Sequence, residues 1–200
     1  MKRFGLTGGI ASGKTWVANK LRELGFHVLD ADSLGHKLME PNLPAYSEIV
    51  CAFGREILLE NGFIDRKKLG TMVFADPAKL AKLNAILHEK IESAINAQFA
   101  EWEKEGITEP VFVEAALLVE AGMHNRLDGL VVVYCSQEKQ VERLCERGLS
   151  RDEALRRIGL QLSNKEKLKH ATYKIDTSGT FGESQHQVEA LAKELRAASS

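Results

Sequence analysis

Residues Gly8 to Thr15 read GGIASGKT, a complete G-x-x-x-x-G-K-[ST] phosphate-binding loop. An apolar segment over 4–7 precedes the loop, and apolar residues recur at helical spacing over 17–24. A strand before the loop and a helix after it form the context in which this pattern binds nucleotide phosphates. The alternative is a glycine-rich turn with an exposed lysine, and the flanking strand and helix argue against it.

Each residue type in the loop suits a chain of phosphates. Gly8 and Gly13 allow backbone conformations that a Cβ would obstruct, so that successive N–H groups can face one anion. The following helix adds unpaired N–H groups and the positive end of its dipole. Lys14 supplies a mobile charge for the β- and γ-phosphates, and the Thr15 hydroxyl is a ligand for Mg²⁺. The loop therefore predicts a nucleoside triphosphate site that serves phosphoryl transfer or hydrolysis.

Composition narrows the class of protein. The chain has 200 residues and a net charge of −1, which gives no general surface for nucleic acid or membrane. No apolar run approaches the length of a membrane span, and the first strand begins too early to leave room for a secretory signal. The three cysteines form no C-x-x-C pair and the histidines are scattered, so we expect free thiols, no zinc site and a cytoplasmic protein.

Strand and helix signals alternate along the chain. After the first strand, we expect strands at 26–29, 111–114, 130–135 and 173–176. Helices are expected mainly over 33–105 and 137–169, with an amphipathic helix at the end of the chain. This pattern predicts an α/β fold, a three-layer open sheet of parallel strands with helices on both faces. Ligands of such sheets bind beyond the carboxyl ends of the strands.

Asp30 and Asp32 end the second predicted strand. Two-residue spacing in an extended chain would point both carboxylates to one side, with Asp32 further toward the edge of the sheet. A carboxylate there can accept the proton of an acceptor hydroxyl or hold a magnesium-bound water. A helix N-cap is an equally good interpretation, because aspartate favours that position and a helix is expected to follow.

The polar helices expected over 137–169 carry a set of arginines, namely Arg143, Arg147, Arg151, Arg156 and Arg157. In a mobile lid, guanidinium groups can close on transferring phosphates. On a solvated helical surface they would only form weak ion pairs, for example with Glu142 or Glu146. The surface interpretation is the better one for any single arginine, whereas for the whole set we expect one or two phosphate contacts.

Other polar residues are less informative by themselves. Glu114 and Glu120 bracket an apolar segment, and a carboxylate at a strand end can hold magnesium-bound water, cap a helix or remain a surface charge. The residues alone favour an ordinary histidine at His88 and a surface charge at Arg66.

Together these segments resemble the dephospho-CoA kinase family over nearly the whole chain. The resemblance rests on GLTGGIASGKT at 5–15, VLDAD at 28–32, IDR at 64–66 and LLVE at 117–120, with Gln140, Arg143, Arg147 and Gln161. Many kinases share the phosphate loop, whereas the LTGGI prefix followed by DAD is much more specific.

The resemblance implies that ATP phosphorylates the ribose 3′-hydroxyl of dephospho-CoA to give CoA and ADP. It also implies one P-loop kinase domain related to nucleoside monophosphate kinases. The sequence leaves open whether the protein is a monomer or a small homo-oligomer. Its core would comprise about 1–32, 107–136 and 172–200, with a helical acceptor-binding region at about 33–106 and a helical lid at about 137–171.

By the same resemblance, site roles carry over by position. Lys14, Asp32 and Arg147 would be catalytic, with Asp32 as the proton acceptor. Dephospho-CoA would be bound by Asp32, Arg66 and His88. ATP, with Mg²⁺ on Thr15, would be bound by Gly8, Gly9, Ala11, Ser12, Gly13, Lys14, Thr15, Trp16, Arg143 and Arg147.

The chain departs from the family pattern at a few positions. It has His88-Glu89 where His-Pro is usual, Ala116 where proline is usual, Ala171-Thr172 where Ala-Asp is common, and Thr177-Ser178-Gly179 where Asn-x-Gly is common. We expect activity to remain because the phosphate loop and Asp32 are intact. Two alternatives are a P-loop kinase for a nucleoside monophosphate or sugar, and a non-catalytic ATP-sensing module, which only the altered C-terminal turn favours.

Overall fold

The computed structural model describes residues 1–198, apart from the side chain of Phe74. The chain forms two compact units, which are described separately below. The first contains Met1–Asp30 and the chain from Gly106 onward, and the second is Ala31–Glu105. The second unit covers nearly the same residues as the helical region expected at 33–106.

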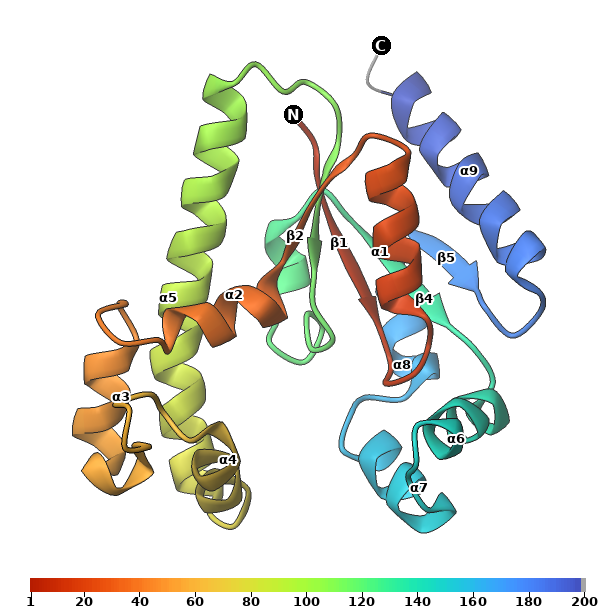
Figure 1. The fold of residues 1–200 in the computed structure, drawn as a ribbon. Helices are drawn as coiled ribbons and strands as arrows, with labels where there is room; N and C mark the ends of the chain where they lie inside the picture. The colour runs from red at the N-terminus through yellow and green to blue at the C-terminus, as the bar shows by residue number, and fades with distance from the viewer. Residues whose placement is uncertain (199–200) are drawn as a thin grey trace. The chain divides into compact units, whose positions relative to one another are not determined.

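The first unit is built on a five-stranded sheet in which every strand pair is parallel (Figure 1). The strand order is β2-β3-β1-β4-β5. The strands are β1 (Arg3–Gly8), β2 (His27–Asp30), β3 (Val111–Glu114), β4 (Gly129–Tyr134) and β5 (Tyr173–Asp176). This confirms the open parallel sheet predicted from the alternating strand and helix signals.

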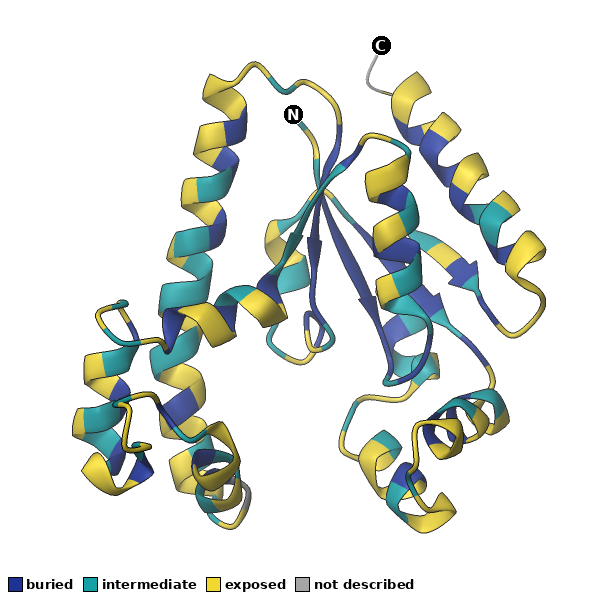
Figure 2. Cartoon of the chain, in the orientation of Figure 1, coloured by how far each residue is buried: buried dark blue, intermediate teal, exposed yellow. Residues whose placement is uncertain are grey.

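Helices and loops cover both faces of the sheet. On one face, α1 (Lys14–Glu23) packs against β1 and β4, and α9 (Phe181–Ala197) packs against β5 and α1. Leu21 and Leu191 join Leu6 and Val131 in the core. The opposite face is covered by the segment after β3, whose Leu118 lies beside Gly5, and by α8 (Asn164–Leu168). The three central strands, β3, β1 and β4, are accordingly buried along most of their length, whereas the edge strands β2 and β5 are only partly buried (Figure 2).

Gly25 lies just beyond the end of the first helix. Its φ of 90° is left-handed, and its N–H donates to Arg22 O at 2.9 Å while the N–H of Phe26 donates to Leu21 O at 3.0 Å. These two bonds satisfy the last carbonyls of the helix and turn the chain into β2.

Three short helices follow β4, in the region 137–169 where helices were expected. They are α6 (Gln137–Glu146), α7 (Arg151–Gly159) and α8, and each begins at a serine N-cap, Ser136, Ser150 and Ser163 respectively. Within the described chain, no helix combines the length and apolar character needed to cross a bilayer.

The second unit consists of helices around its own core. They are α2 (Ala31–Leu38), α3 (Tyr46–Phe53), the 3₁₀ turn η1 (Arg55–Ile57), α4 (Arg66–Phe74) and α5 (Pro77–Lys104). Leu38, Ile49, Ile57 and Leu83 are buried together. The side chain of Asp76 caps α5, and Pro77 is the first residue of that helix, a position that suits proline.

The extended chain predicted through Asp32 is wrong. β2 ends at Asp30 and α2 begins at Ala31, so Asp32 lies in the first turn of a helix and does not share a strand face with Asp30. The physical reason is that an acidic side chain is stabilised in the first helical turn, where the helix dipole is positive.

Candidate active site

The phosphate loop connects the end of β1 to the start of α1. Ala11 and Gly13 have φ values of 58° and 85°, and the N–H of Ser12 donates to Gly9 O at 3.0 Å. Two left-handed residues so close together bend the backbone into a nest whose N–H groups can surround one anion. A Cβ on Gly8 would lie 2.3 Å from Val133 O, so the predicted need for glycine at this position is explained by close approach of β4.

Side chains from 137–171 hold the outside of the loop. The N–H of Ile10 donates to Gln161 Oε1, and Gln140 Nε2 donates to Ile10 O, both at 2.7 Å. Asn164 Nδ2 donates to Cys135 O at 2.8 Å and lies 3.4 Å from Gln140 Oε1. The two glutamines thus fix the backbone of Ile10 from both sides, which preorganises the loop for a ligand.

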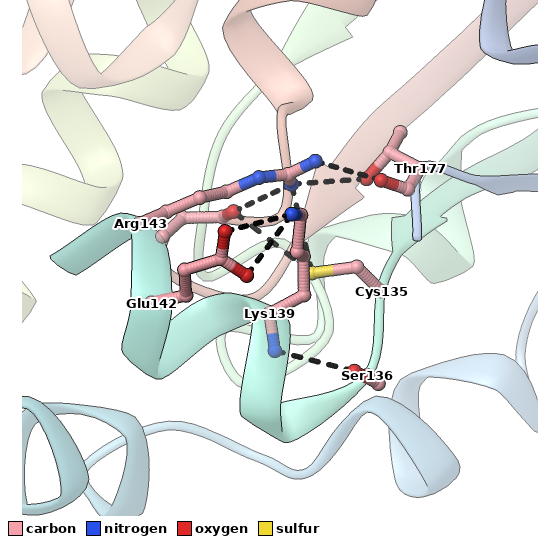
Figure 3. A network of polar contacts seen from close by, with 7 residues as sticks. Cys135, Ser136, Lys139, Glu142, Arg143 and Thr177 are labelled. Carbon is pink, nitrogen blue, oxygen red and sulfur yellow. Dashed lines mark hydrogen bonds and ion pairs between the residues drawn. The ribbon is translucent and has the colours of Figure 1, made fainter. Parts of the chain in front are cut away.

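Arg143 ties the loop to the turn after β5 (Figure 3). Its guanidinium donates to Ala11 O at 3.0 Å, to Thr177 Oγ1 at 3.2 Å and to Thr177 O at 2.7 Å. The buried Thr177 hydroxyl lies 2.6 Å from Ser12 O. The surface interpretation of Arg143 is therefore wrong, because its guanidinium bridges two loops of the core.

Lys14, the first residue of α1, forms an ion pair with Glu114, the last residue of β3. Lys14 Nζ lies 2.9 Å from Glu114 Oε1, and Arg22 Nη2 lies 3.4 Å from Glu114 Oε2. Glu114 is buried at the end of β3, in register with Leu6 of β1. Its burial rules out the surface charge, and its carboxylate pairs with two cations. That it holds a magnesium-bound water stays a prediction.

A cavity of about 490 Å³ opens beside the loop. Its walls come from the loop and the first turn of α1, from α6 with Arg147, and from the segment 177–184. This volume lies in the range of sites that enclose small-molecule ligands. A loop shaped for phosphates next to such a cavity suits a nucleotide, with its phosphates in the loop and its nucleoside in the cavity.

Comparison with known proteins identifies the family. The family profile described as dephospho-CoA kinase matches residues 3–183. The chain belongs to the dephospho-CoA kinase family. It is 46% identical to the dephospho-CoA kinase of Geobacter metallireducens over 191 residues, which cover 95% of this chain and 94% of that relative. The resemblance read from the sequence is confirmed.

Solved structures agree with this family membership. Dephospho-CoA kinase from Campylobacter jejuni matches with a TM-score of 0.75 and 29% identity, covering 100% of both chains. A Thermus thermophilus protein of known structure matches with a TM-score of 0.83 and 33% identity, covering 97% of both chains.

In this dephospho-CoA kinase family member, Asp32 is exposed in the first turn of α2. The strand before it ends at Asp30, which pairs in register with Glu114. The chain therefore leaves the sheet at its carboxyl edge two residues before Asp32. Its catalytic role stays a prediction.

Two further residues expected to bind dephospho-CoA lie on helices of the second unit. Arg66 is the first residue of α4, after the N-cap Asp65, and its Nη2 lies 2.7 Å from His36 Nε2. His88 is exposed on α5. The pairing of Arg66 with His36 could not be read from the sequence, because thirty positions separate the two residues.

Arg147 remains available for the cavity. It is exposed, follows the last residue of α6 and lines the cavity wall. Of the two arginines predicted to bind nucleotide, Arg147 is the one placed on the surface, whereas Arg143 is engaged by Ala11 and Thr177. Their roles in binding stay predictions.

The departures from the family pattern near the C-terminus have structural explanations. Thr172 extends the pairing of β4, because its N–H donates to Leu130 O at 2.8 Å and its Oγ1 accepts from Leu130 N at 3.0 Å. Thr177 links Arg143 to Ser12 as described above. Both threonines are therefore held by hydrogen bonds, Thr172 at an exposed position and Thr177 at a buried one.

Lys167 is a buried residue that the sequence did not single out. Its Nζ lies 2.6 Å from Ala116 O and 2.8 Å from Glu120 Oε1, and Glu120 also accepts from the N–H of Leu162 at 3.0 Å. Glu120 is therefore an anchor for α8 and for the chain before it. No sequence signal marks this lysine, since lysine is ordinarily a surface residue.

Proposed function

We propose that this chain transfers the γ-phosphoryl group of ATP to the ribose 3′-hydroxyl of dephospho-CoA, giving CoA and ADP. One observation carries the proposal: the match to the dephospho-CoA kinase family spans residues 3–183 and includes an intact phosphate loop bent by Ala11 and Gly13. We also propose that the protein works in the cytoplasm, where both substrates would be small soluble molecules.

ATP would bind with its phosphates in the loop. The N–H groups at the start of α1 have no partner within the helix and carry the positive end of its dipole. Lys14 adds a full charge beside these groups, and Glu114 holds its ammonium at 2.9 Å. The nucleoside would occupy the adjacent cavity, which the loop and α6 share.

The loop also fits a magnesium ion. Thr15 is exposed at the start of α1, and a hydroxyl oxygen is the kind of ligand that Mg²⁺ takes together with phosphate oxygens and water. When bound, the ion would neutralise charge on the β- and γ-phosphates.

Asp32 would accept the proton of the 3′-hydroxyl. The hydroxyl oxygen then forms a bond to the γ-phosphorus while the bond from that phosphorus to the bridging oxygen of ADP breaks. Lys14 and Arg147 would stabilise the negative charge that spreads over the transferring group. Residues 137–171 would act as a lid that keeps water, a competing acceptor, away from the phosphoryl group.

An acceptor screen tests the proposal. Purified protein is given ATP, magnesium and either dephospho-CoA, a nucleoside monophosphate or a simple sugar, and ADP release is followed together with the mass of the product. We expect ADP and a 3′-phosphorylated product with dephospho-CoA only. Efficient phosphorylation of another acceptor, or ATP binding with no ADP from any acceptor, would overturn the assignment.

A further inference from the structure

Phe181 is an unusually exposed aromatic residue at the edge of the cavity. Its exposed fraction is 77%, although it is the first residue of α9 in a rigid setting. Thr180 and Glu183 form a reciprocal capping box there, which fixes the backbone at the start of the helix. An apolar ring held in water by a rigid backbone is unfavourable by itself, which points to a ligand that covers it.

Trp16 stands next to Phe181 on the same wall. The centroids of the two rings are 5.8 Å apart with planes inclined by 51°, and both residues line the cavity. The indole also packs against the core residues of α1 and α9, and this packing fixes its position. The two rings form one continuous aromatic surface, although 165 positions separate them in the sequence.

The aromatic surface of Trp16 and Phe181 begins next to the residues that would bind the phosphates. Trp16 follows Lys14 and Thr15 directly in the first turn of α1. In a nucleotide, the nucleoside is attached to the α-phosphate, the phosphate furthest from the transferring group. A base that leaves the loop into the cavity therefore meets the indole and the phenyl ring.

The hydroxyl groups of the same cavity are already engaged by the protein. Thr177 Oγ1 bonds with Ser12 O and Arg143, Thr180 Oγ1 bonds with Glu183, and Ser184 Oγ lies 3.1 Å from Thr180 O. Lys139 is similarly paired with Glu142 at 2.9 Å. Aromatic area is thus the feature of this wall that is best suited to hold a base.

We propose that Trp16 and Phe181 form an aromatic wall on which the base of the bound nucleotide stacks. The inference rests on the proposed function only in taking the nucleotide to be ATP. Stacking of a base on an aromatic side chain holds the base without reading its edge, so the wall contributes affinity and orientation for the nucleoside and little to the grip on the phosphates.

The test compares ATP with inorganic tripolyphosphate, which has the phosphates and lacks the nucleoside. Dissociation constants for both are measured by calorimetry, with magnesium and without acceptor, for the wild type, Phe181→Ala and Trp16→Leu. We expect each substitution to weaken ATP binding about tenfold, as loss of one stacking partner does elsewhere. Tripolyphosphate binding should be unchanged.

Two further variants separate stacking from general effects. Phe181→Tyr keeps the ring and should keep ATP affinity. Phe63→Ala removes a phenyl ring that is 46% exposed in the second unit, outside the cavity, and should change neither ligand's affinity. Tryptophan fluorescence adds a direct readout, because ATP should alter the emission of the wild type and not that of Trp16→Phe, in which only Trp102 remains.

The inference is overturned if Phe181→Ala and Trp16→Leu bind ATP like the wild type. It is also overturned if they lose affinity for ATP and tripolyphosphate equally, since the substitutions would then act on the phosphate loop. Failure of the proposed function gives a different result: ATP binding would still depend on the aromatic wall, whereas dephospho-CoA would not be phosphorylated.

Discussion

Lys14 at the start of α1 donates to Glu114 at the end of β3, at 2.9 Å from Nζ to Oε1. The Glu114 carboxylate is buried and also lies 3.4 Å from Arg22 Nη2, so two cations share one negative charge at the end of β3. The ion pair thus fixes the Lys14 ammonium at the start of α1, in the phosphate-binding loop.

Replacing this lysine should abolish most turnover. Lys14→Ala removes a preorganised positive charge from the site of phosphoryl transfer, and loss of one such contact costs on the order of 10²–10³-fold in kcat. Steady-state ADP release with dephospho-CoA measures the effect. Lys20→Ala provides the control, because Lys20 lies on the same helix, is paired with Glu23 at 3.0 Å and should retain wild-type turnover. Near-normal turnover of Lys14→Ala would remove the lysine from the mechanism.

Asp32→Asn should keep ATP binding and lose most turnover. A positioned general base contributes about 10²–10⁴-fold, and the amide cannot accept the hydroxyl proton. The matched control is Asp152→Asn, because both aspartates are the second residue of a helix and both substitutions remove a charge from the first turn. If single-turnover assays showed equal losses of turnover for the two variants, Asp32 would contribute only by stabilising the first turn of α2.

The sheet and the phosphate loop were readable from the sequence because their signals are local. β3 and β5 have the predicted bounds, since short apolar runs between polar turns determine buried parallel strands. Asp32 was misplaced because both a strand end and a helix start favour aspartate at that point. β2 has only four residues, too few for an alternation of apolar and polar residues that would show where the strand ends and the helix begins.

The contacts around the loop were not readable because they join distant segments. Arg143 reaches Thr177 over 34 positions and Ala11 over 132, and Lys167 reaches Glu120 over 47. In a polar helix with many arginines and lysines, the sequence does not show whether one of these side chains is buried. Only the folded chain distinguishes Arg143 and Lys167 from their exposed neighbours.

Thr177→Val should weaken both the fold and ATP binding. The substitution keeps the shape and deletes the hydroxyl that joins Ser12 O to Arg143, and an unsatisfied buried group costs about 1–3 kcal/mol. Urea denaturation measures the stability, and the KM for ATP reports the loop. Thr177→Ser retains the hydroxyl and should behave much more like the wild type. If both variants were equally impaired, the methyl group would be the important part of Thr177.

Thiol labelling should distinguish the buried cysteine from the other two. Burial raises the pKa of the Cys135 thiol, so its reactive thiolate appears only at more alkaline pH than that of an exposed thiol. Cys51 and Cys145 are exposed. At about pH 8, near the ordinary cysteine pKa, mass spectrometry should show rapid labelling of these two and labelling of Cys135 only after unfolding. Equal rates at all three positions would contradict the buried setting beside Arg143.

The ion pair between Glu120 and Lys167 should respond asymmetrically to loss of either partner. The Lys167 side chain is 0% exposed, whereas that of Glu120 is 22% exposed. Glu120→Gln leaves a buried ammonium without its anion, and breaking a buried pair in this way costs about 3–5 kcal/mol. Lys167→Met leaves a carboxylate that water can reach and that still accepts from the N–H of Leu162, so it should cost less.

Urea denaturation of the two single variants and of the double variant Glu120→Gln/Lys167→Met measures this asymmetry. The double variant should be more stable than Glu120→Gln alone, because it no longer buries an uncompensated charge. Equal costs for the two single variants, or strictly additive costs in the double variant, would show that water reaches Lys167 in solution. α8 would then be held to the segment after β3 by packing alone, and its attachment would be independent of charge.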